Sequence, residues 1–376
     1  MRIPIHRALR LTLASLLVTA VAQAAIQPIP LPGGEAGAGW KGTQFVAADR
    51  SGKVFFFRSE TFEVYPVTQD GSFGKPLELE TRLAPQSSDV ASASMSPGGS
   101  LWIVKEGKAL RLFENGKERP LPPLQWPAQS IGFRRDTPIV AVLPLPLGTS
   151  AEQARKMGNP PRLVQLDKDR WSTFVESKEG TMAEILDREP GGLNDSLAEA
   201  SVSMVSDRQG RLWLAPRYAY RLERLSPTGR LLSSLLVDGG KVRKKGDSRG
   251  IEIQRKPTQN PSSATRSPSQ EKASFFPFTA EAVLHGVAEG RDGRLYVLVR
   301  EAGGGLAVDR YDAVQALLER VPITARFDGS LTMAAGRDGL YIAAHQARAG
   351  RWKISWEALE QAAWKKIDMD AVEPGP

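Results

Sequence analysis

Acidic and amide side chains precede several short apolar stretches of this 376-residue sequence. Counted back from a recurring glycine turn, the equivalent positions are Lys41, Asp89, Gln129, Glu199, Glu281 and Asp328. Four of the six are carboxylates, and Asn194 and Asp195 lie just upstream of Glu199. Ca²⁺ and Mg²⁺ prefer such oxygen donors, so Asn194, Asp195, Glu199 and Glu281 are candidate metal ligands. The alternative interpretation is a set of solvated loop acids.

Histidine is scarce, which limits the chemistry that the chain can perform. After the first 24 residues only His285 and His345 remain, so a histidine-rich zinc site is excluded. His285 lies in an apolar stretch near Glu281 and is a candidate general base, with Glu199 as a second catalytic candidate. A single histidine in a strand is otherwise a hydrogen-bonded core residue. The sequence therefore leaves open whether the protein is an enzyme.

Ligand-lining residues are expected among the same entrance positions. The candidates are Asp89, Gln129, Glu199, Glu281 and Asp328, together with Trp126. Trp102 and Trp213 occupy equivalent places in a repeat and are expected in the core, whereas Trp126 is free of the repeat and could line a ligand site. Burial of Trp126 in the core is the alternative.

A short sequence repeat predicts the strands that would position these residues. A polar turn with glycine precedes an aliphatic and usually an aromatic residue, and one copy lacks the glycine. The copies are Asp49–Phe55, Ser96–Trp102, Asp136–Val140, Asp207–Trp213, Asp292–Tyr296 and Asp338–Tyr341. Glycine suits a tight hairpin turn, and the residues after it suit a half-buried strand. Six such repeats predict an all-β protein, a six-bladed β-propeller of four-stranded antiparallel blades. An open sandwich of similar strand count is the alternative.

The strands of each blade can be placed around these turns. The predicted first strands are Thr43–Ala47, Val90–Ser94, Ser130–Phe133, Ser201–Val205, Val283–Ala288 and Leu331–Ala335. Leu231–Val237, Ala316–Val321 and Ala358–Ile367 are predicted as fourth strands, although each has a pattern that a helix also allows. An extended N-terminal segment, Ile26–Leu31, is expected to complete the last blade and close the ring.

Three long interruptions stretch the repeat, at Leu145–Pro161, Ser177–Leu197 and Gly239–Ala280. In an up-and-down blade the connections of these kinds emerge on one face, so we expect all three above blades 3, 4 and 5. Thr149–Glu152 and Thr181–Glu184 each match a helix capping box. Clustered loops on a rigid scaffold are typical of a binding surface, although exposed loops also tolerate insertions without any function.

The N-terminus predicts export. Arg2, Arg7 and Arg10 precede an apolar run from Leu11 to Ala22, and Ala22–Ala24 offers a small-residue cleavage site, so residues 1–24 are interpreted as a secretory signal peptide. The run of about twelve apolar residues is shorter than the roughly 20 of a spanning helix, so no transmembrane segment is expected after processing. Residues 25–376 are expected to form a single propeller domain in the periplasm or outside the cell. Because the chain contains no cysteine, its hydrophobic core must stabilise the domain without disulfides.

Charge is concentrated in one segment. The net charge of +8 includes +3 from the signal peptide and +6 from Lys241–Lys272, so the rest of the chain carries −1. A nearly neutral body has no overall field to attract a polyanion, so no specific nucleic-acid partner is expected. The basic segment lies within residues 239–280, and serines and prolines fill residues 260–269, which is typical of a flexible loop. An anionic envelope polymer is its expected partner, and a solvated linker is the alternative.

The stretch Asp207–Leu225, DRQGRLWLAPRYAYRLERL, followed by PTGRLL, resembles the repeat of NHL-type and gluconolactonase-like six-bladed propellers. The resemblance covers the repeats only. Gluconolactonase-like enzymes hold a divalent cation in the channel through acidic and asparagine side chains, which are the types of Asn194, Asp195, Glu199 and Glu281. NHL-type propellers often serve as binding or scaffold modules.

These observations favour an exported binding module for a small ligand, glycan or protein on the insertion-bearing face. The alternative is a divalent-cation-dependent hydrolase or lactonase that acts in the central channel.

Overall fold

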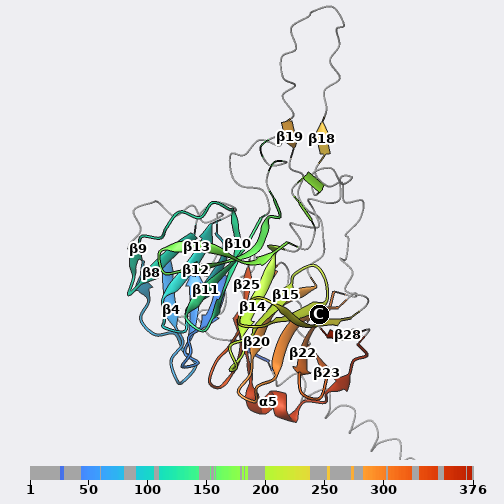
Figure 1. Ribbon diagram of the computed structural model, residues 1–376. Coiled ribbons are helices and arrows are strands. Elements are labelled where there is room, and N and C mark those ends of the chain that lie inside the picture. The colour runs from blue at the N-terminus through green and yellow to red at the C-terminus, as the bar shows by residue number, and fades with distance from the viewer. Residues whose placement is uncertain are drawn as a thin grey trace, which may run out of the picture.

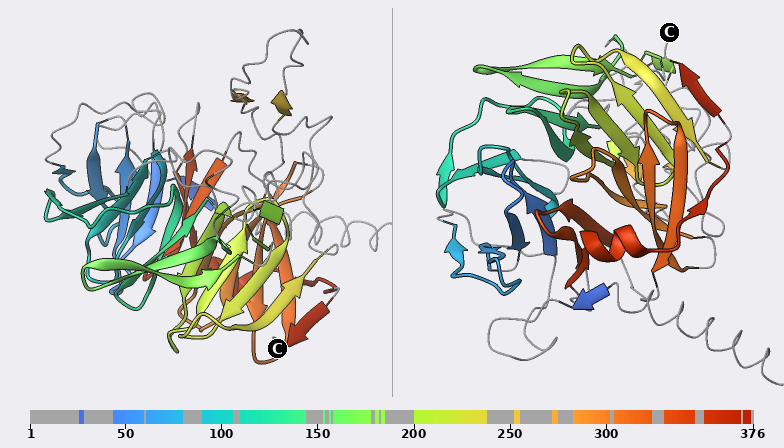
Figure 2. Two further views of the ribbon diagram at one scale, coloured as in Figure 1. Left: turned by 45° about the horizontal axis from the view of Figure 1, so that its top comes forward. Right: turned by 90° about the horizontal axis from the view of Figure 1, so that it is seen from below.

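Six antiparallel sheets surround a common axis in the computed structural model of the chain (Figures 1 and 2). The structure describes residues 26–28, 44–59, 61–79, 90–105, 110–143, 153, 156, 158–177, 180–181, 183–184, 200–237, 252–254, 272–274, 283–301, 304–323, 330–345, 351–369 and 371–374. The sheets confirm the predicted six-bladed β-propeller.

The first three blades are four-stranded meanders. Blade 1 contains β2 (Gln44–Ala48), β3 (Val54–Arg58), β4 (Glu63–Pro66) and β5 (Leu77–Glu78). Blade 2 contains β6 (Val90–Met95), β7 (Leu101–Lys105), β8 (Leu110–Glu114) and β9 (Lys117–Arg119). Blade 3 contains β10 (Ala128–Arg134), β11 (Thr137–Val142), β12 (Pro161–Asp167) and β13 (Arg170–Glu176).

Blades 4 and 5 each gain a fifth strand from the C-terminal part of the chain. Blade 4 contains β14 (Val202–Ser206), β15 (Leu212–Pro216), β16 (Arg221–Leu225), β17 (Leu231–Leu236) and β28 (Ala371–Pro374). Blade 5 contains β20 (Leu284–Glu289), β21 (Leu295–Arg300), β22 (Leu306–Asp312), β23 (Leu317–Ile323) and β27 (Lys365–Lys366). The added strands cover outer edges that would otherwise present unpaired backbone groups.

Blade 6 closes the ring with the other end of the chain. It contains β24 (Ser330–Ala335), β25 (Gly339–His345) and β26 (Arg351–Ser355), and its outer strand is the N-terminal β1 (Ile26–Pro28). Ile26 lies opposite Ile354, and Pro28 opposite Trp352. The predicted closure by the N-terminal segment is therefore confirmed for these residues.

One predicted strand is wrong. Residues Ala358–Ile367 do not form the outer strand of blade 6, because β1 already occupies that edge. Instead the six-residue helix α5 (Trp356–Gln361) follows β26, and the Ser355 side chain caps it by accepting a hydrogen bond from the Ala358 N–H. Trp356 and Leu359 of α5 are buried against blades 5 and 6, which gives this amphipathic segment its apolar partner.

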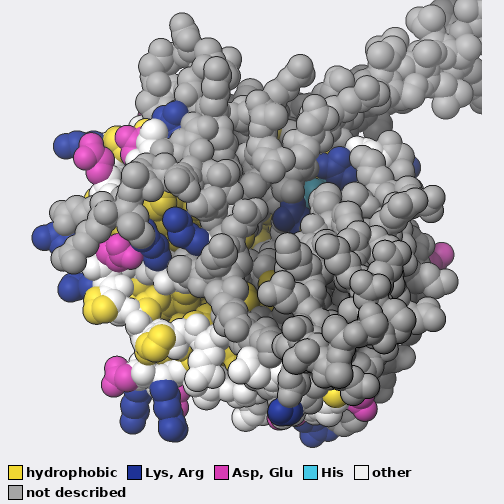
Figure 3. Space-filling model, turned by 90° about the horizontal axis from the view of Figure 1, so that it is seen from above, with side chains coloured by type: hydrophobic (Ala, Val, Ile, Leu, Met, Phe, Trp, Pro, Cys, Tyr) yellow, Lys and Arg dark blue, Asp and Glu magenta, His cyan; other side chains and the backbone are white. Residues whose placement is uncertain are grey.

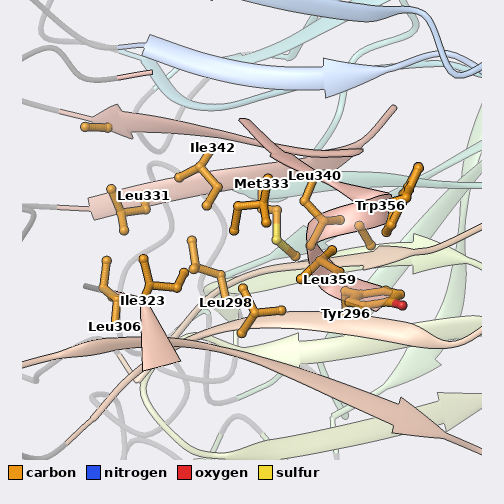
Figure 4. Packing of buried hydrophobic residues seen from close by; sticks show 14 residues of the cluster. Tyr296, Leu298, Leu306, Ile323, Leu331, Met333, Leu340, Ile342, Trp356 and Leu359 are labelled. Carbon is orange, nitrogen blue, oxygen red and sulfur yellow. The ribbon is translucent and has the colours of Figure 1, made fainter. Parts of the chain in front are cut away.

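Six hydrophobic clusters lie between neighbouring blades, one at each junction of the ring. In β25, Leu340 and Ile342 join the cluster shared with blade 5, whereas Tyr341 and Ala343 join the cluster shared with blade 1. Figure 4 shows the former, with Leu298 and Tyr296 of blade 5 facing Ile342 and Trp356. Because successive strand residues point to opposite faces, a strand buried on both sides must be apolar throughout.

The inner strands approach one another closely around the axis. β2, β6, β10, β14, β20 and β24 contact each other in cyclic order, and β24 also contacts β2. Two hydroxyls link adjacent blades: Ser203 accepts a hydrogen bond from the Val287 N–H, and Thr332 accepts one from the Val46 N–H, both at 3.2 Å. These two small side chains therefore hold neighbouring blades together near the axis.

Candidate site at the upper rim

All three predicted insertions join strand ends at the same end of the ring, here called the upper rim. The first connects β11 to β12, the second β13 to β14, and the third β17 to β20. In an antiparallel meander these connections share one face, and the glycine turns lie on the other. Within the third insertion the short strands β18 (Glu252–Gln254) and β19 (Lys272–Ser274) pair with each other and stand above the blades (Figure 1).

One predicted capping box is confirmed in the second insertion. The Thr181 N–H donates to the Glu184 carboxylate at 2.7 Å, and the Glu184 N–H donates to the Thr181 hydroxyl at 3.3 Å. This reciprocal pair satisfies two backbone donors of a helical turn. The other predicted box, Thr149–Glu152, lies outside the described residues.

Most of the predicted site residues lie outside the part of the chain that the structure describes. These are Lys41, Asp89, Asn194, Asp195, Glu199, Glu281 and Asp328. Their roles in binding, catalysis or metal coordination stay predictions. Gln129, Trp126 and His285 are described, and their surroundings can be stated.

Three inner strands carry a β-bulge at their upper end. The pairing register shifts between Val90 and Ser92, between Ala128 and Ser130, and between Leu284 and Gly286. The extra residues are therefore Ala91, Gln129 and His285, at equivalent places in blades 2, 3 and 5. A bulge re-aims a side chain and is common beside functional sites. Two of the three candidate residues that the structure describes thus occupy this special position.

Trp126 precedes the bulge of blade 3 and is half-buried. Its side chain packs against the hydrophobic cluster between blades 2 and 3. The structure gives Trp126 a packing partner, and its use as a ligand-lining residue stays a prediction.

His285 lies beneath the upper rim between blades 5 and 6. It is 6% exposed. Arg300 Nε lies 3.2 Å from His285 Nε2, and the Leu331 N–H of blade 6 donates to Nδ1 at 3.3 Å. Burial, with the positive charges of Arg217 and Arg300, lowers the pKa of His285 well below its ordinary value. The imidazole is therefore neutral near pH 7.

Arg217 completes this group from blade 4, directly after β15. Its carbonyl accepts hydrogen bonds from the Val283 N–H at 2.7 Å and the Leu284 N–H at 3.0 Å. Its own N–H donates to the Ser201 carbonyl at 2.8 Å. These backbone bonds hold Arg217 against the start of the inner strand that carries His285. We call Arg217, His285 and Arg300 the upper-rim cluster.

Arg217 contributes a buried polar atom to the upper-rim cluster. Arg217 Nη2 is buried and has no hydrogen-bond acceptor among the described residues. Burial is the main cause that lowers the pKa of the Arg217 guanidinium, and the neighbouring Arg300 charge lowers it further. Figure 3 looks down on this face and shows a histidine side chain with lysine or arginine side chains on two sides of it. His285 is the histidine whose side chain the structure describes.

Sequence reasoning found His285 but missed its two arginine partners. The repeats contain a pattern that could have identified these arginines. A basic residue ends or directly follows the second strand of four blades, at Arg58, Lys105, Arg217 and Arg300. Alignment of the six repeats on their glycine turns would have placed these side chains at one rim.

Metal ligands do not gather in the described part of the chain. Among those residues there is no group of three or more histidine, cysteine, aspartate or glutamate side chains that could hold an ion. The donors at the upper-rim cluster are guanidinium N–H groups, which repel a cation. The described residues of this rim therefore do not fit a divalent metal, and the four predicted metal ligands lie outside them.

On the far face, which carries the glycine turns, three aspartates have hydrogen-bond partners within their own repeat. Each of three turn aspartates accepts a hydrogen bond from the aromatic residue of its own repeat. The pairs are Asp207–Trp213 at 3.2 Å, Asp292–Tyr296 at 3.0 Å and Asp338–Tyr341 at 2.8 Å. These three aspartates therefore stabilise the turn of their own repeat, and their role is structural.

Comparisons with known proteins add little about function. No protein-family model and no curated protein matches the chain. Virginiamycin B lyase from Staphylococcus aureus is similar in structure at 12% identity and a TM-score of 0.45, over 87% of this chain and 98% of that chain. Regucalcin from Agrobacterium tumefaciens, a calcium-binding protein, is 12% identical with a TM-score of 0.42, over 87% and 90%. A Bacteroides thetaiotaomicron protein of unknown function is 8% identical with a TM-score of 0.48, over 88% and 75%. Likeness at this level carries no argument about ligand or reaction, and the fold assignment depends on the sheets themselves.

Proposed function

We propose that this chain is an exported binding propeller that holds a small ligand, glycan or protein at its upper rim. The observation that carries the proposal is the upper-rim cluster, in which His285 is buried and the buried Nη2 atom of Arg217 has no hydrogen-bond acceptor among the described residues. A buried polar atom without a partner costs free energy. A ligand that supplies the missing acceptors offsets this cost.

The arrangement of the rim supports the same interpretation. Three long insertions connect strand ends at the upper rim of blades 3, 4 and 5, while three turn aspartates on the far face bond within their own repeats. A rigid array of sheets with long loops at one end is a common platform for recognition. Fold alone does not specify an activity, so the argument depends on the cluster.

Export is supported by the position of the first strand. β1 begins at Ile26, two residues after the predicted cleavage site at Ala24, so removal of residues 1–24 leaves the ring-closing strand intact. No helix in the described part of the chain has the length and apolar character to span a membrane.

The basic segment Lys241–Lys272 is proposed as a second contact, for an anionic envelope polymer. It carries +6, and its two short strands rise from the rim side of blades 4 and 5 (Figure 1). Deletion of the whole segment removes β18 and the first residue of β19, and with them the pairing of these two strands. We expect this deletion to preserve the melting temperature and to weaken co-sedimentation with anionic envelope polymers. Unchanged co-sedimentation would remove the segment from the proposal.

The binding proposal is tested by a thermal-shift and glycan-array screen of the processed chain, followed by variants of the two faces. Gln129→Arg changes a bulge residue at the upper rim, and Arg50→Glu changes an exposed turn residue on the far face. Loss of binding with the first variant and retention with the second is the expected result. Equal binding by both variants would place the ligand elsewhere on the molecule.

Metal removal separates this proposal from the alternative hydrolase. If the rim is a binding site of the kind proposed, dialysis against EDTA leaves the melting temperature unchanged. A melting temperature that rises with Ca²⁺, together with turnover of an ester or lactone that Glu199→Gln abolishes, would favour the cation-dependent hydrolase instead.

A further inference from the structure

A proline-rich segment of the upper rim joins β9, the outer strand of blade 2, to β10, the inner strand of blade 3 (Figure 1). It covers residues 120–127, with the sequence PLPPLQWP, and it forms neither helix nor strand. A proline ring fixes φ at about −65°, and a residue before proline avoids the helical region. Both effects favour polyproline II, an extended left-handed helix with three residues per turn. Residues 120–124 therefore favour this conformation, and a bend follows at Gln125.

The exposure of these residues follows the same period of three. Pro120 and Pro123 are exposed, whereas Leu121 and Leu124 are partly buried and pack against the hydrophobic cluster between blades 2 and 3. Residues three apart share one row of a polyproline II helix, so the leucines form an inward row and the two prolines an outward row. We call Pro120 and Pro123 the proline ridge. The leucine row attaches the segment to the blades and leaves the proline ridge facing solvent.

The chain itself holds the segment in place. The Trp171 indole N–H of β13 donates to the Pro122 carbonyl at 3.0 Å, and the Leu143 N–H donates to the Pro127 carbonyl at 2.9 Å. A polyproline II helix has no internal hydrogen bonds, so its carbonyls need donors from elsewhere. A segment that is already fixed loses little conformational freedom when a partner binds. The proline ridge is thus preorganised for recognition.

Basic side chains border the proline ridge at its β9 end. Lys117 and Arg119 are two residues apart in β9, so they point to the same face of the strand. Both are exposed, while Glu118 points to the opposite face and lies 3.4 Å from Arg111. Arg119 also pairs with Glu114, at 2.9 Å and with both side chains exposed. Such a surface pair contributes little to stability, so a carboxylate of a partner can replace Glu114.

We propose that the proline ridge binds a partner protein, in a groove lined by aromatic side chains and bordered by carboxylates. This inference rests on the proposed function, because the ridge lies at the upper rim, and it names the kind of protein partner. Aromatic-lined grooves recognise Pro-x-x-Pro segments, since the polyproline II helix is already formed and costs little entropy to bind. Pro120 and Pro123 have this spacing. Carboxylates beside the groove pair with Lys117 and Arg119.

The test is a calorimetric titration of the processed chain with three purified domains that bind polyproline II peptides, namely an SH3, a WW and an EVH1 domain. The double variant Pro120→Ala with Pro123→Ala removes the proline ridge. Pro227→Ala is the matched control, because it removes an exposed proline from the turn between β16 and β17 on the far face. All three positions are exposed, so both variants should melt close to the native chain.

We expect at least one domain to bind the native chain and Pro227→Ala, and to bind the double variant about tenfold more weakly. Arg119→Ala should reduce the dependence of this binding on salt. The isolated peptide of residues 119–126 should compete for the same domain with lower affinity, because Trp171 does not hold it. Binding by none of the three domains, or equal binding by the native chain and the double variant, overturns the inference.

A purely structural role of the segment gives a different result. If it only seals the junction between blades 2 and 3, Leu121→Ala lowers the melting temperature and none of the three domains binds. A second copy of the chain is a further occupant to test, by light scattering of the native chain and the double variant. A dimer that the double variant abolishes would make the second copy the occupant and overturn the inference.

Failure of the inference differs from failure of the proposed function. A ligand from the glycan array that Gln129→Arg loses, without binding of any of the three domains, would leave the binding module in place and refute the role of the proline ridge. Absence of both ligand and domain binding would refute both.

Discussion

At the scale of single residues, His285 is the residue whose chemistry the fold changes most. Its ring is buried between two blades and faces two arginines, so its pKa lies well below the ordinary value of 6.5. A general base also needs a nitrogen free to accept a proton from a substrate. Both ring nitrogens of His285 face N–H donors, so catalysis at this residue stays a prediction that requires the ring to change partners.

The lowered pKa of His285 predicts a pH dependence of stability. The unfolded chain binds a proton at His285 below about pH 6.5, whereas the folded chain does so only at lower pH. Stability from this residue is therefore complete above pH 6.5 and falls as the pH decreases, by up to about 1.4 kcal/mol per pH unit. Urea unfolding between pH 5 and 8 should show this slope in the native chain and lose it in His285→Asn.

His345→Asn is the control, because His285 and His345 are the two histidines that remain after residue 24. A stability difference between the native chain and His285→Asn that stays constant with pH would contradict the lowered pKa.

The turn aspartates provide a second prediction at the residue scale. Asp207 accepts hydrogen bonds from two backbone N–H groups of its turn and from the indole of Trp213, which is 2% exposed. Asp49 accepts the same kind of turn bonds, but the aromatic residue of its repeat is Phe55, which has no donor. Asp207→Ala leaves a buried indole N–H unsatisfied and should reduce the free energy of unfolding by about 1–3 kcal/mol more than Asp49→Ala. Equal losses in denaturant unfolding would show that the turn bonds alone matter.

At the scale of elements, the inner strands are spaced too closely for ordinary side chains at two glycines. A Cβ atom on Gly132 would lie 2.4 Å from Met204 Cβ of the next inner strand, and one on Gly286 would lie 2.9 Å from Met333 Cβ. Both contacts are between adjacent blades near the axis. Glycine permits the close approach that closure of six sheets into a ring requires.

Gly132→Ala should therefore destabilise the protein by about 1–3 kcal/mol, because the added methyl group must push two inner strands apart. Gly158→Ala is the matched control, since a Cβ there meets nothing within 4 Å and the backbone is not left-handed. We expect that control to be neutral or slightly stabilising in thermal unfolding. A neutral Gly132→Ala would mean that the inner strands are not closely packed.

The C-terminal part of the chain acts as a strap across two outer edges. After α5, β27 pairs with β23 of blade 5, and β28 then pairs with β17 of blade 4. Tyr296 of blade 5 contacts both Trp356 and Trp364, and Arg310 lies 4.2 Å above the Trp364 ring. These aromatic contacts fix the strap to blade 5 before it reaches blade 4.

At the scale of the whole molecule, the ring depends on a closure between the two ends of the chain. The three residues of β1 supply the outer strand of blade 6, and a hydrophobic cluster joins blades 1 and 6 on the inside. Closure removes the two exposed edges that an open array of blades would leave.

A covalent staple tests this closure. Gln27 and Lys353 are directly opposed across β1 and β26, and the chain contains no cysteine that could interfere. Directly opposed positions in an antiparallel pair have the Cα separation that a disulfide requires. Gln27→Cys with Lys353→Cys should form a disulfide that stabilises the oxidised protein by roughly 2–4 kcal/mol relative to its reduced form. The single cysteine variants are controls, and identical oxidised and reduced melting temperatures would show that β1 does not limit unfolding.

Much of this architecture was predictable because it depends on local sequence patterns. A glycine turn followed by apolar residues marks a hairpin wherever it occurs, and six copies at propeller spacing determine the number of blades. The first strands, the closing strand at Ile26 and the capping box at Thr181 follow from the same kind of short-range signal. Ala358–Ile367 was assigned incorrectly because its pattern is compatible with both strand and helix, and only the occupied edge of blade 6 decides between them.

The sequence alone thus determined the fold class, the blade count and the face that carries the insertions, since each depends on turns and periodicity within one repeat. Tertiary structure alone decided which side chains meet at the upper rim. Arg217, His285 and Arg300 come from two repeats, and Leu331 from a third. Their proximity arises from the radial arrangement of sheets and from a bulge that turns His285 toward its neighbours, and no pattern within a single repeat encodes either.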